Sequence, residues 1–234
     1  MGKEKLIENL NQVKENIKKA AVKADRDYSE VKLLAVSKNQ TLDNIKIFNK
    51  AGINIFGENR VQELEEKDEK LKKENIKLDW HFIGHLQRNK VKYLMRMDNC
   101  QMIESIDSLR LAKEVNKRAA KNDRIIPVLV EINVAGDENK FGITPDKAES
   151  FLKKIINFDN LKVEGLMTVL PYLDDSEKLR NYFKEMKNLF DQLSENVINL
   201  NELSMGMTND YQIAVEEGAT IVRVGTALFG EREY

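Results

Sequence analysis

The chain has 234 residues, and its charges nearly cancel: 38 Lys and Arg stand against 39 Asp and Glu, for a formal net charge of -1. This balance lacks the basic excess needed to neutralise many phosphates, so we expect no nucleic acid partner. With 41% apolar residues, 11 Gly and 3 Pro, the composition is that of a folded globular protein rather than a disordered or fibrous one.

The chain shows no sign of export or membrane insertion. Cys100 is its single cysteine and cannot form an internal disulfide. The N-terminus opens with charged residues rather than an apolar signal core, and no apolar stretch approaches the roughly 18–20 residues that span a bilayer. We therefore expect a cytoplasmic protein that does not bind membranes.

Residues 3–24 have the apolar periodicity of an amphipathic helix. Leu6, Leu10, Val13 and Ile17 recur at spacings of three and four, with polar residues between them. The period changes at residues 31–38, VKLLAVSK, whose short apolar run is typical of a strand buried on both faces. Residues 42–51 then predict a helix that ends at Gly52.

This alternation of short apolar runs and longer amphipathic segments continues to the end of the chain. The amphipathic segments are long enough for crossover helices between parallel strands. The predicted strands span residues 31–38, 53–57, 80–84, 100–106, 125–134, 163–169, 201–207 and 220–225. Eight such units without a linker predict an α/β fold: a single (β/α)8 TIM barrel domain over residues 1–234, with an extra N-terminal helix.

In such a barrel the working residues lie where the strands end, so the last two strand ends are informative together. Ser204 with Gly206, and Gly225 with Thr226, supply hydroxyl groups and closely approachable backbone N–H groups. The loops after strands seven and eight are also the usual phosphate site of this architecture. These residues predict a phosphate ester site, although either segment alone is also an ordinary turn sequence.

Two cationic side chains belong to the same end of the barrel. Lys38 follows the first buried strand, where desolvation would lower its pKa as a Schiff-base lysine requires; the alternative is a lysine that extends to solvent. Arg223 lies two residues before Gly225, so it points inward and needs an acceptor. An internal ion pair with Glu104 or Glu131 is the alternative to a ligand contact.

Seven motifs, in this order along the chain, resemble the pyridoxal phosphate homeostasis proteins, which are relatives of the alanine racemase barrel. They are LLAVSK at the first strand, FGENRVQE after the second, WHFIGHLQRNK at the third, FGI after the fifth, GLMT at the sixth, ELSMGMTND at the seventh, and VRVGTALFGER at the end. These motifs span essentially the whole chain, which makes the resemblance far more specific than any single motif.

The resemblance implies that the protein binds pyridoxal 5′-phosphate (PLP), held as a Schiff base on Lys38. Arg223 would lie at the pyridine nitrogen and keep it unprotonated, which weakens the ring as an electron sink. Ser204, Gly225 and Thr226 would hold the phosphate. The other contacts that the resemblance implies are Gly206 and Met207 in the same pocket, Asn59 near the ring, Met167 packing toward it, and Ile83 and His85 at the rim.

The implied function is intracellular PLP homeostasis, in which the protein buffers or delivers the cofactor and so affects amino acid and keto acid balance. Alanine racemase takes its second acid/base, a tyrosine, from a C-terminal domain of a partner subunit, whereas this chain ends at Tyr234, soon after the eighth predicted strand. We therefore expect no two-base racemisation and no enzyme activity. We also expect a monomer, with PLP as ligand and PLP-dependent apoenzymes as candidate partners.

Two alternatives stay open from the sequence: a PLP-dependent, racemase-like enzyme, and a barrel that binds another phosphorylated metabolite with Lys38 as an electrostatic ligand. Other features predict structure rather than chemistry. His81 and His85 lie across a predicted strand and turn, so we expect no metal site. Cys100 is expected in the core. The pairs Glu58/Glu63 and Glu131/Asp137 are expected to be rim or helix-cap residues.

Overall fold

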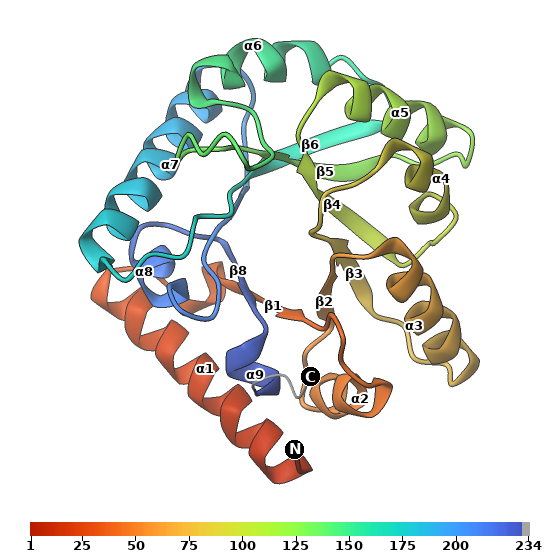
Figure 1. The fold of residues 1–234 in the computed structure, drawn as a ribbon, viewed down its shortest axis with the longest axis vertical. Coiled ribbons are helices and arrows are strands. Elements are labelled where there is room, and N and C mark those ends of the chain that lie inside the picture. The colour runs from red at the N-terminus through yellow and green to blue at the C-terminus, as the bar shows by residue number, and fades with distance from the viewer. Residues whose placement is uncertain (231–234) are drawn as a thin grey trace.

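The structure, a computed structural model, describes residues 1–230 and contains the predicted barrel (Figure 1). Its eight parallel strands close in sequential order, and β1 pairs with β8. The strands are β1 (Lys32–Val36), β2 (Ile55–Glu58), β3 (Asp79–Phe82), β4 (Cys100–Ile106), β5 (Ile126–Glu131), β6 (Leu161–Met167), β7 (Glu202–Ser204) and β8 (Ile221–Val224). The predicted (β/α)8 fold is therefore confirmed.

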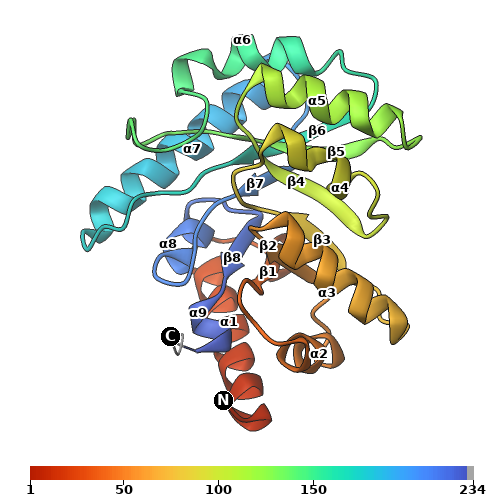
Figure 2. The same ribbon diagram turned by 45° about the vertical axis from the view of Figure 1, so that its right-hand side comes forward.

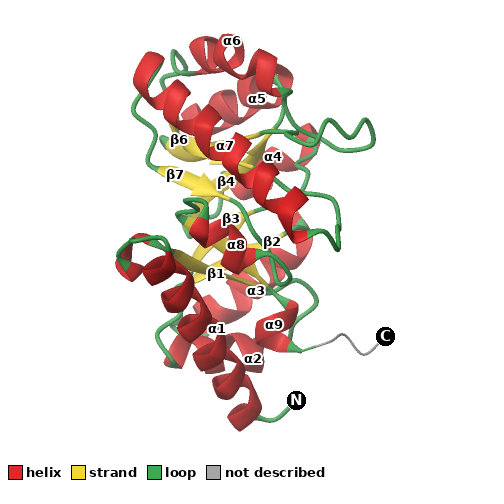
Figure 3. Cartoon of the chain, turned by 90° about the vertical axis from the view of Figure 1, so that its left-hand side faces the viewer, coloured by secondary structure: helices red, strands yellow, loops and turns green. Residues whose placement is uncertain are grey.

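Helices surround the strands on the outside (Figure 3). They are α1 (Lys3–Lys23), α2 (Leu42–Lys50), α3 (Val61–Lys73), α4 (Val91–Leu94), α5 (Leu109–Ala120), α6 (Pro145–Ile155), α7 (Ser176–Asn196), α8 (Tyr211–Glu216) and α9 (Thr226–Phe229), with 3-10 turns η1 (Tyr28–Glu30) and η2 (Arg88–Lys90). None of the helices within residues 1–230 combines the length and apolar character needed to cross a bilayer. The predicted single domain over residues 1–234 includes 231–234, which lie outside the described residues, and stays a prediction.

The extra N-terminal helix is confirmed as α1, which lies along the outside of the barrel beside α8 and α9 (Figures 1 and 2). Its buried residues include the predicted Leu6, Leu10, Val13 and Ile17, and the same stripe continues through Ala20 and Ala21. Two side-chain amides fix its position, since Asn9 donates to the Leu228 carbonyl at 3.1 Å and Asn16 to the Tyr211 hydroxyl at 2.9 Å. The helix therefore covers the junction between the last two βα units.

The apolar side chains form two layers. Most pack between the barrel and its helices, as expected for strands buried on both faces. A second, smaller cluster fills the barrel interior and consists of Leu34, Val36, Met102, Leu129, Met167 and Ile221, with Ile55, Ile83 and Val169 packed against it. This interior cluster supports the floor of the cavity described below.

The largest differences from the predicted strands are in β5 and β7, which each end three residues before the predicted end. The strand expected over 125–134 ends at Glu131 because the Asn133 side chain then bonds to the backbone of Asp137, donating to its carbonyl at 2.8 Å and accepting from its N–H at 3.2 Å. The strand expected over 201–207 ends at Ser204, since Gly206 has a φ of +91°. In both places local turn geometry ends the strand before the apolar pattern does.

Candidate functional site

A cavity of about 400 Å³ opens at the carboxyl ends of the strands, within the usual size range of small-ligand sites. This is the end of a (β/α)8 barrel where active sites are found. The lining residues belong to the βα units of β1, β2, β3, β6, β7 and β8: Val36, Lys38, Gln40, Asn59, Ile83, Gly84, Val169, Leu170, Pro171, Tyr172, Leu173, Leu179, Met207, Thr208, Asn209, Asp210, Arg223, Gly225, Thr226 and Gly230.

Seven of the eleven residues singled out from the sequence line this one cavity: Lys38, Asn59, Ile83, Met207, Arg223, Gly225 and Thr226. They come from strands β1, β2, β3, β7 and β8 or from the loops that follow these strands. The two that lie farthest apart along the chain, Lys38 and Thr226, are 188 positions apart. Barrel closure through the β1–β8 pair therefore brings them together.

Lys38 lies in a tight turn at the end of β1. The turn is closed by a hydrogen bond from Gln40 N–H to the Ser37 carbonyl at 2.9 Å. Asn39 has a φ of +61°, a left-handed conformation that asparagine adopts more readily than most residues. Val36 and Gln40 line the cavity beside Lys38, so the turn directs this segment toward the cavity rather than into the first crossover helix.

Arg223 is almost fully buried, at 3% exposure, on β8. Its Nη1 donates to the Ser204 hydroxyl and its Nη2 to the Thr168 carbonyl, each at 2.7 Å. Burial lowers the pKa of the guanidinium, although the charges of Glu104, Asp210 and Glu131 act in the opposite direction. The predicted inward orientation is confirmed, and the guanidinium presents a fixed positive charge at the cavity wall.

The Arg223 contact continues into a buried polar chain inside the barrel. The Ser204 hydroxyl donates to Glu104 Oε2 at 2.6 Å, and Glu104 Oε1 lies 2.6 Å from Nδ1 of His81. Burial alone raises the pKa of Glu104, but His81, Arg223 and the Ser204 hydroxyl outweigh it and the pKa is lowered. Arg223 therefore reaches Glu104 through Ser204, where the sequence left a direct ion pair open.

The loops after β7 and β8 form the polar side of the cavity. Thr208 accepts a hydrogen bond from Ala227 N–H at 3.3 Å, which ties the two loops together. Asp210 accepts from Met207 N–H at 2.5 Å, and burial raises the pKa of Asp210 despite that bond and the charge of Arg223. Thr208 was not among the residues singled out, although it stands in the same SMGMT segment.

The structure places four of the predicted residues outside the cavity lining. Ser204 has its hydroxyl committed to Glu104 and Arg223. Met167 belongs to the interior cluster. Gly206 packs against α8, where an added Cβ would lie 2.5 Å from Cβ of Ala214. His85 pairs with Asp107 at 3.0 Å and stacks on Phe141 with 3.5 Å between ring centroids.

The segment after β6 supplies an apolar wall that sequence reasoning missed. Residues 169–173, VLPYL, line the cavity together with Leu179 of α7. Tyr172 is 77% exposed at the outer edge of this wall. A signal was present, because an apolar run containing proline lies between a strand end and the helix start, where a barrel loop should be polar.

Asn59 and Ile83 form the side of the cavity built by β2 and β3. Ile83 N–H donates to the Glu58 carbonyl at 2.9 Å, which continues the sheet beyond the last strand residues. Gly84 packs directly against Asn59, and an added Cβ would lie 2.4 Å from the Asn59 carbonyl oxygen. Asn59 is thus held in place by close backbone packing.

The donor set of the cavity fits a phosphorylated aldehyde with a basic ring nitrogen. Lys38 supplies an amine that can condense with an aldehyde, and Arg223 a permanent cation that can donate to a ring nitrogen. Thr208 and Thr226 supply hydroxyl groups, and Gly225 leaves its backbone open to close approach. No group of three or more His, Cys, Asp or Glu side chains within residues 1–230 is arranged to hold a metal ion.

Comparison with known proteins gives consistent matches over almost the whole chain. Residues 9–233 match the family model of the alanine racemase N-terminal domain. The pyridoxal phosphate homeostasis protein of Aquifex aeolicus is 46% identical over 228 residues, covering 97% of this chain and 98% of that relative.

Two solved structures have the same architecture. A protein of unknown function from Bifidobacterium adolescentis superposes with a TM-score of 0.90 at 31% identity, covering 97% of this chain and 95% of that one. PipY of Synechococcus elongatus, solved with PLP bound, gives a TM-score of 0.79 at 32% identity, covering 86% of this chain and 93% of that one. The chain belongs to the pyridoxal phosphate homeostasis protein family, built on the alanine racemase N-terminal domain.

Proposed function

We propose that this protein binds PLP in the barrel cavity and serves intracellular PLP homeostasis, as a carrier or buffer of the cofactor. The main observation is that Lys38, in the turn after the first strand, and Arg223, on the last strand, line one cavity together with Gly225 and Thr226. The pyridoxal phosphate homeostasis protein of Aquifex aeolicus and the PLP-bound PipY structure support the same ligand.

Each group around the cavity has a distinct role in this proposal. Lys38 would hold the cofactor covalently through its amino group, and Arg223 would donate to the ring nitrogen. Gly225, Thr226 and Thr208 would bind the phosphate. Asn59, Met207 and Ile83 would contact the ring and its substituents. Ser204, Gly206 and Met167 would act from behind the lining, with Ser204 fixing Arg223, while His85 would hold the rim through Asp107.

Arg223 also bears on what the bound cofactor can do. When bound, PLP supplies an electrophilic aldehyde and a ring that can withdraw electrons from an attached amino acid. A guanidinium donates a hydrogen bond but does not give up its proton, so it would leave the ring nitrogen unprotonated and weaken that withdrawal. We infer that the protein holds the cofactor without turning over amino acids, and that PLP-dependent apoenzymes receive the cofactor from a cytoplasmic monomer.

The binding proposal is tested by adding PLP to the purified protein and following the absorbance of the bound cofactor. We expect a band in the wild type that is lost in Lys38→Ala. Because exposed lysines also react with aldehydes, the adduct is fixed by borohydride reduction and mapped by mass spectrometry, with Lys113→Ala on the exposed face of α5 as the matched control. A band that survives in Lys38→Ala and maps elsewhere would overturn the assignment.

The carrier role and the racemase-like alternative differ in proton exchange. Loss of the α-proton of amino acids to deuterated solvent, measured with the loaded protein, should not exceed the rate with free PLP. Exchange well above that rate would establish enzyme activity. Transfer of PLP to an apoenzyme is then measured with and without a phosphatase that destroys free PLP. Direct delivery should continue when the phosphatase is present. Transfer that the phosphatase abolishes would refute direct delivery.

A further inference from the structure

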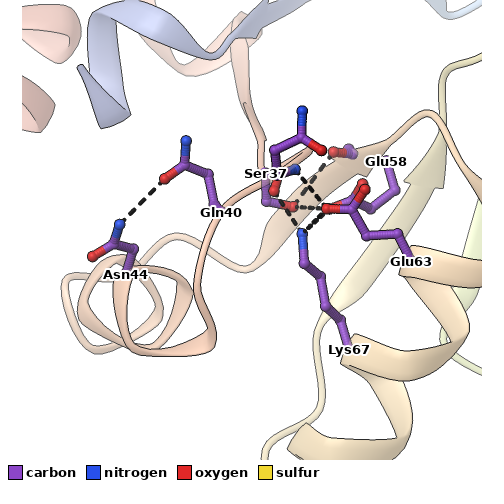
Figure 4. Close-up of polar contacts among 8 residues, drawn as sticks. Ser37, Gln40, Asn44, Glu58, Glu63 and Lys67 are labelled. Atoms are coloured by element: carbon purple, nitrogen blue, oxygen red, sulfur yellow. Dashed lines mark hydrogen bonds and ion pairs between the residues drawn. The ribbon is translucent and has the colours of Figure 1, made fainter. Parts of the chain in front are cut away.

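Two charged side chains of α3 hold the two peptide groups that flank Lys38. Nζ of Lys67 donates to the carbonyl of Ser37, in the peptide bond before Lys38, at 2.6 Å. Oε1 of Glu63 accepts from the N–H of Asn39, in the peptide bond after Lys38, at 2.5 Å. Figure 4 shows both side chains reaching from the helix to this turn. The Cα atom of Lys38 is thus fixed from both sides.

The same two side chains are bonded to each other and to a buried carboxylate. Nζ of Lys67 lies 2.7 Å from Oε1 of Glu63 and 2.7 Å from Oε1 of Glu58, so its three protons meet three acceptors (Figure 4). Oε1 of Glu58 also accepts from the Ser37 hydroxyl at 2.7 Å. We refer to Glu58, Glu63 and Lys67 as the α3 clamp.

The charged groups of the α3 clamp lose much of their contact with water, and burying charges in this way costs free energy. Glu58 is fully buried, the Lys67 side chain is only 9% exposed, and the second oxygen of Glu58 has no hydrogen-bond partner within residues 1–230. Burial raises the pKa of Glu58, although Lys67 and the Ser37 hydroxyl act in the opposite direction. Since buried ion pairs contribute little net stability compared with apolar residues, their best-supported use is to select one conformation.

The conformation selected here is less common than a right-handed or extended one. Asn39 has a φ of +61°, in the left-handed region that residues other than glycine adopt only at a cost in energy, although asparagine adopts it more readily than most. The bond from Asn39 N–H to Glu63 holds the chain in this turn. Without it, the backbone of Lys38 could relax to an extended path and redirect the lysine side chain.

We propose that Glu63 and Lys67, supported by Glu58, are positioning residues that aim Lys38 at the aldehyde of the cofactor. The proposal rests on the proposed function. Nζ of Lys38 condenses with the aldehyde, forming a C=N bond and releasing one water molecule, so no oxidant or reductant is required. Holding an amine in line with its target raises the effective concentration of the reacting groups without adding a contact to the ligand.

The test separates the covalent step from binding of the rest of the cofactor by using two ligands. PLP carries the aldehyde, whereas pyridoxine 5′-phosphate carries an alcohol at that position and cannot form the bond. We expect Glu63→Ala and Lys67→Met to weaken PLP binding at least tenfold and to change pyridoxine 5′-phosphate binding less than twofold. Lys67→Arg, which keeps the charge and the donors, should restore part of the PLP affinity.

The matched control lies one turn further along the same helix. Lys72 forms an i,i+4 ion pair with Asp68 at 2.7 Å, and Asp68 contacts Trp80 and Asn99 rather than the Lys38 turn. Lys72→Met should leave both affinities within twofold of the wild type. Thermal unfolding establishes whether each variant keeps the fold. Because the Glu63 side chain is 20% exposed, we expect Glu63→Ala to stay folded even if Lys67→Met does not.

Two results would overturn the clamp proposal: unchanged PLP affinity in Glu63→Ala, or equal weakening of both ligands, which would mean that the clamp shapes the whole cavity. A failure of the proposed function would look different. In that case the wild type would not bind PLP more tightly than pyridoxine 5′-phosphate, or Lys38→Ala would bind both ligands as the wild type does.

Discussion

Arg223 and Ser204 are joined by a 2.7 Å hydrogen bond that connects the cavity wall to the interior of the barrel. The Ser204 hydroxyl accepts this bond and donates its own proton to Glu104. The charge at the cavity wall is therefore balanced by Glu104, a carboxylate that does not line the cavity. The orientation of Arg223 depends on that carboxylate through Ser204.

Replacing the buried carboxylate should destabilise the fold. Glu104→Leu removes the carboxylate that bonds to Ser204 and His81 and leaves Arg223 buried without its main balancing charge. We expect a loss of about 3–5 kcal/mol in the free energy of unfolding, measured by urea denaturation. Glu114→Leu, which breaks the surface pair with Arg118, is the control and should cost about 0–1 kcal/mol. Equal losses in the two variants would contradict the buried chain.

Glu131 should make stability fall as pH rises from the ordinary glutamate pKa to about 7. Burial and the nearby Asp107 raise the pKa of Glu131 to about 7, against the effects of Arg223 and Lys140. The folded state then binds more protons than the unfolded state between the ordinary glutamate pKa and about 7, so stability declines across that window as pH increases. Glu131→Gln removes the titration and should flatten the profile.

Because Glu131 is only partly buried, solvent limits the change in the free energy of unfolding that its titration can cause. Glu131→Gln should be more stable than the wild type by roughly 1–3 kcal/mol at pH 8, and the gain should shrink toward pH 4.5. Thermal or urea unfolding across this pH range gives the profile. Glu138→Gln, at an exposed position of the following loop, serves as control and should leave the profile unchanged. A constant offset between Glu131→Gln and the wild type would refute the titration.

Gly84 should be intolerant of a side chain because it supports Asn59. In Gly84→Ala the new Cβ would approach the Asn59 carbonyl oxygen to 2.4 Å and its Cα to 2.8 Å, so the backbone has to move. We expect a cost of about 1–3 kcal/mol in stability. We also expect at least tenfold weaker PLP binding, measured by cofactor titration.

Gly52→Asn is the control for that substitution. An added Cβ at Gly52 meets no atom within 4 Å, and asparagine accepts its φ of +87° better than most residues. Cofactor affinity should be unchanged in this variant. Wild-type affinity in Gly84→Ala would show that Asn59 does not need to be held at its observed position.

Cys100 should be chemically silent in the folded protein. It is fully buried, and desolvation raises the pKa of its thiol to about 12, so the reactive thiolate is scarce. Alkylation should therefore proceed only as the chain opens, and its rate should rise with urea. Cys introduced by Val22→Cys, on the exposed face of α1, should label rapidly without urea. Rapid labelling of Cys100 in native buffer would contradict this burial.

The barrel could be predicted from the sequence because each strand carries its own short apolar run and each helix its own period. The position of α1 was predictable for the same reason, since its buried stripe from Leu6 to Ala21 is a local pattern. The ends of β5 and β7 could not be predicted in this way. The Asn133 turn and the positive φ of Gly206 depend on hydrogen bonds and packing that apolar periodicity does not encode.

The cavity residues were predictable to the extent that they stand at strand ends. Lys38, Arg223, Gly225 and Thr226 follow from barrel geometry once the strands are placed. Ser204 also stands at a strand end, but its hydroxyl is directed by Glu104, one hundred positions away. Sequence alone gave no way to choose between the ligand and that internal acceptor.

The pairing of β1 with β8 has a consequence for the biosynthesis of the protein. Leu34 lies opposite Arg223, so the strand that leads to Lys38 and the strand that carries Arg223 are neighbours in space and nearly the farthest apart in translation. A nascent chain on the ribosome exposes Lys38 long before Arg223 and Thr226 have been made. If Lys38 holds the cofactor as proposed, selective capture of the vitamin-derived aldehyde has to wait for the last βα unit.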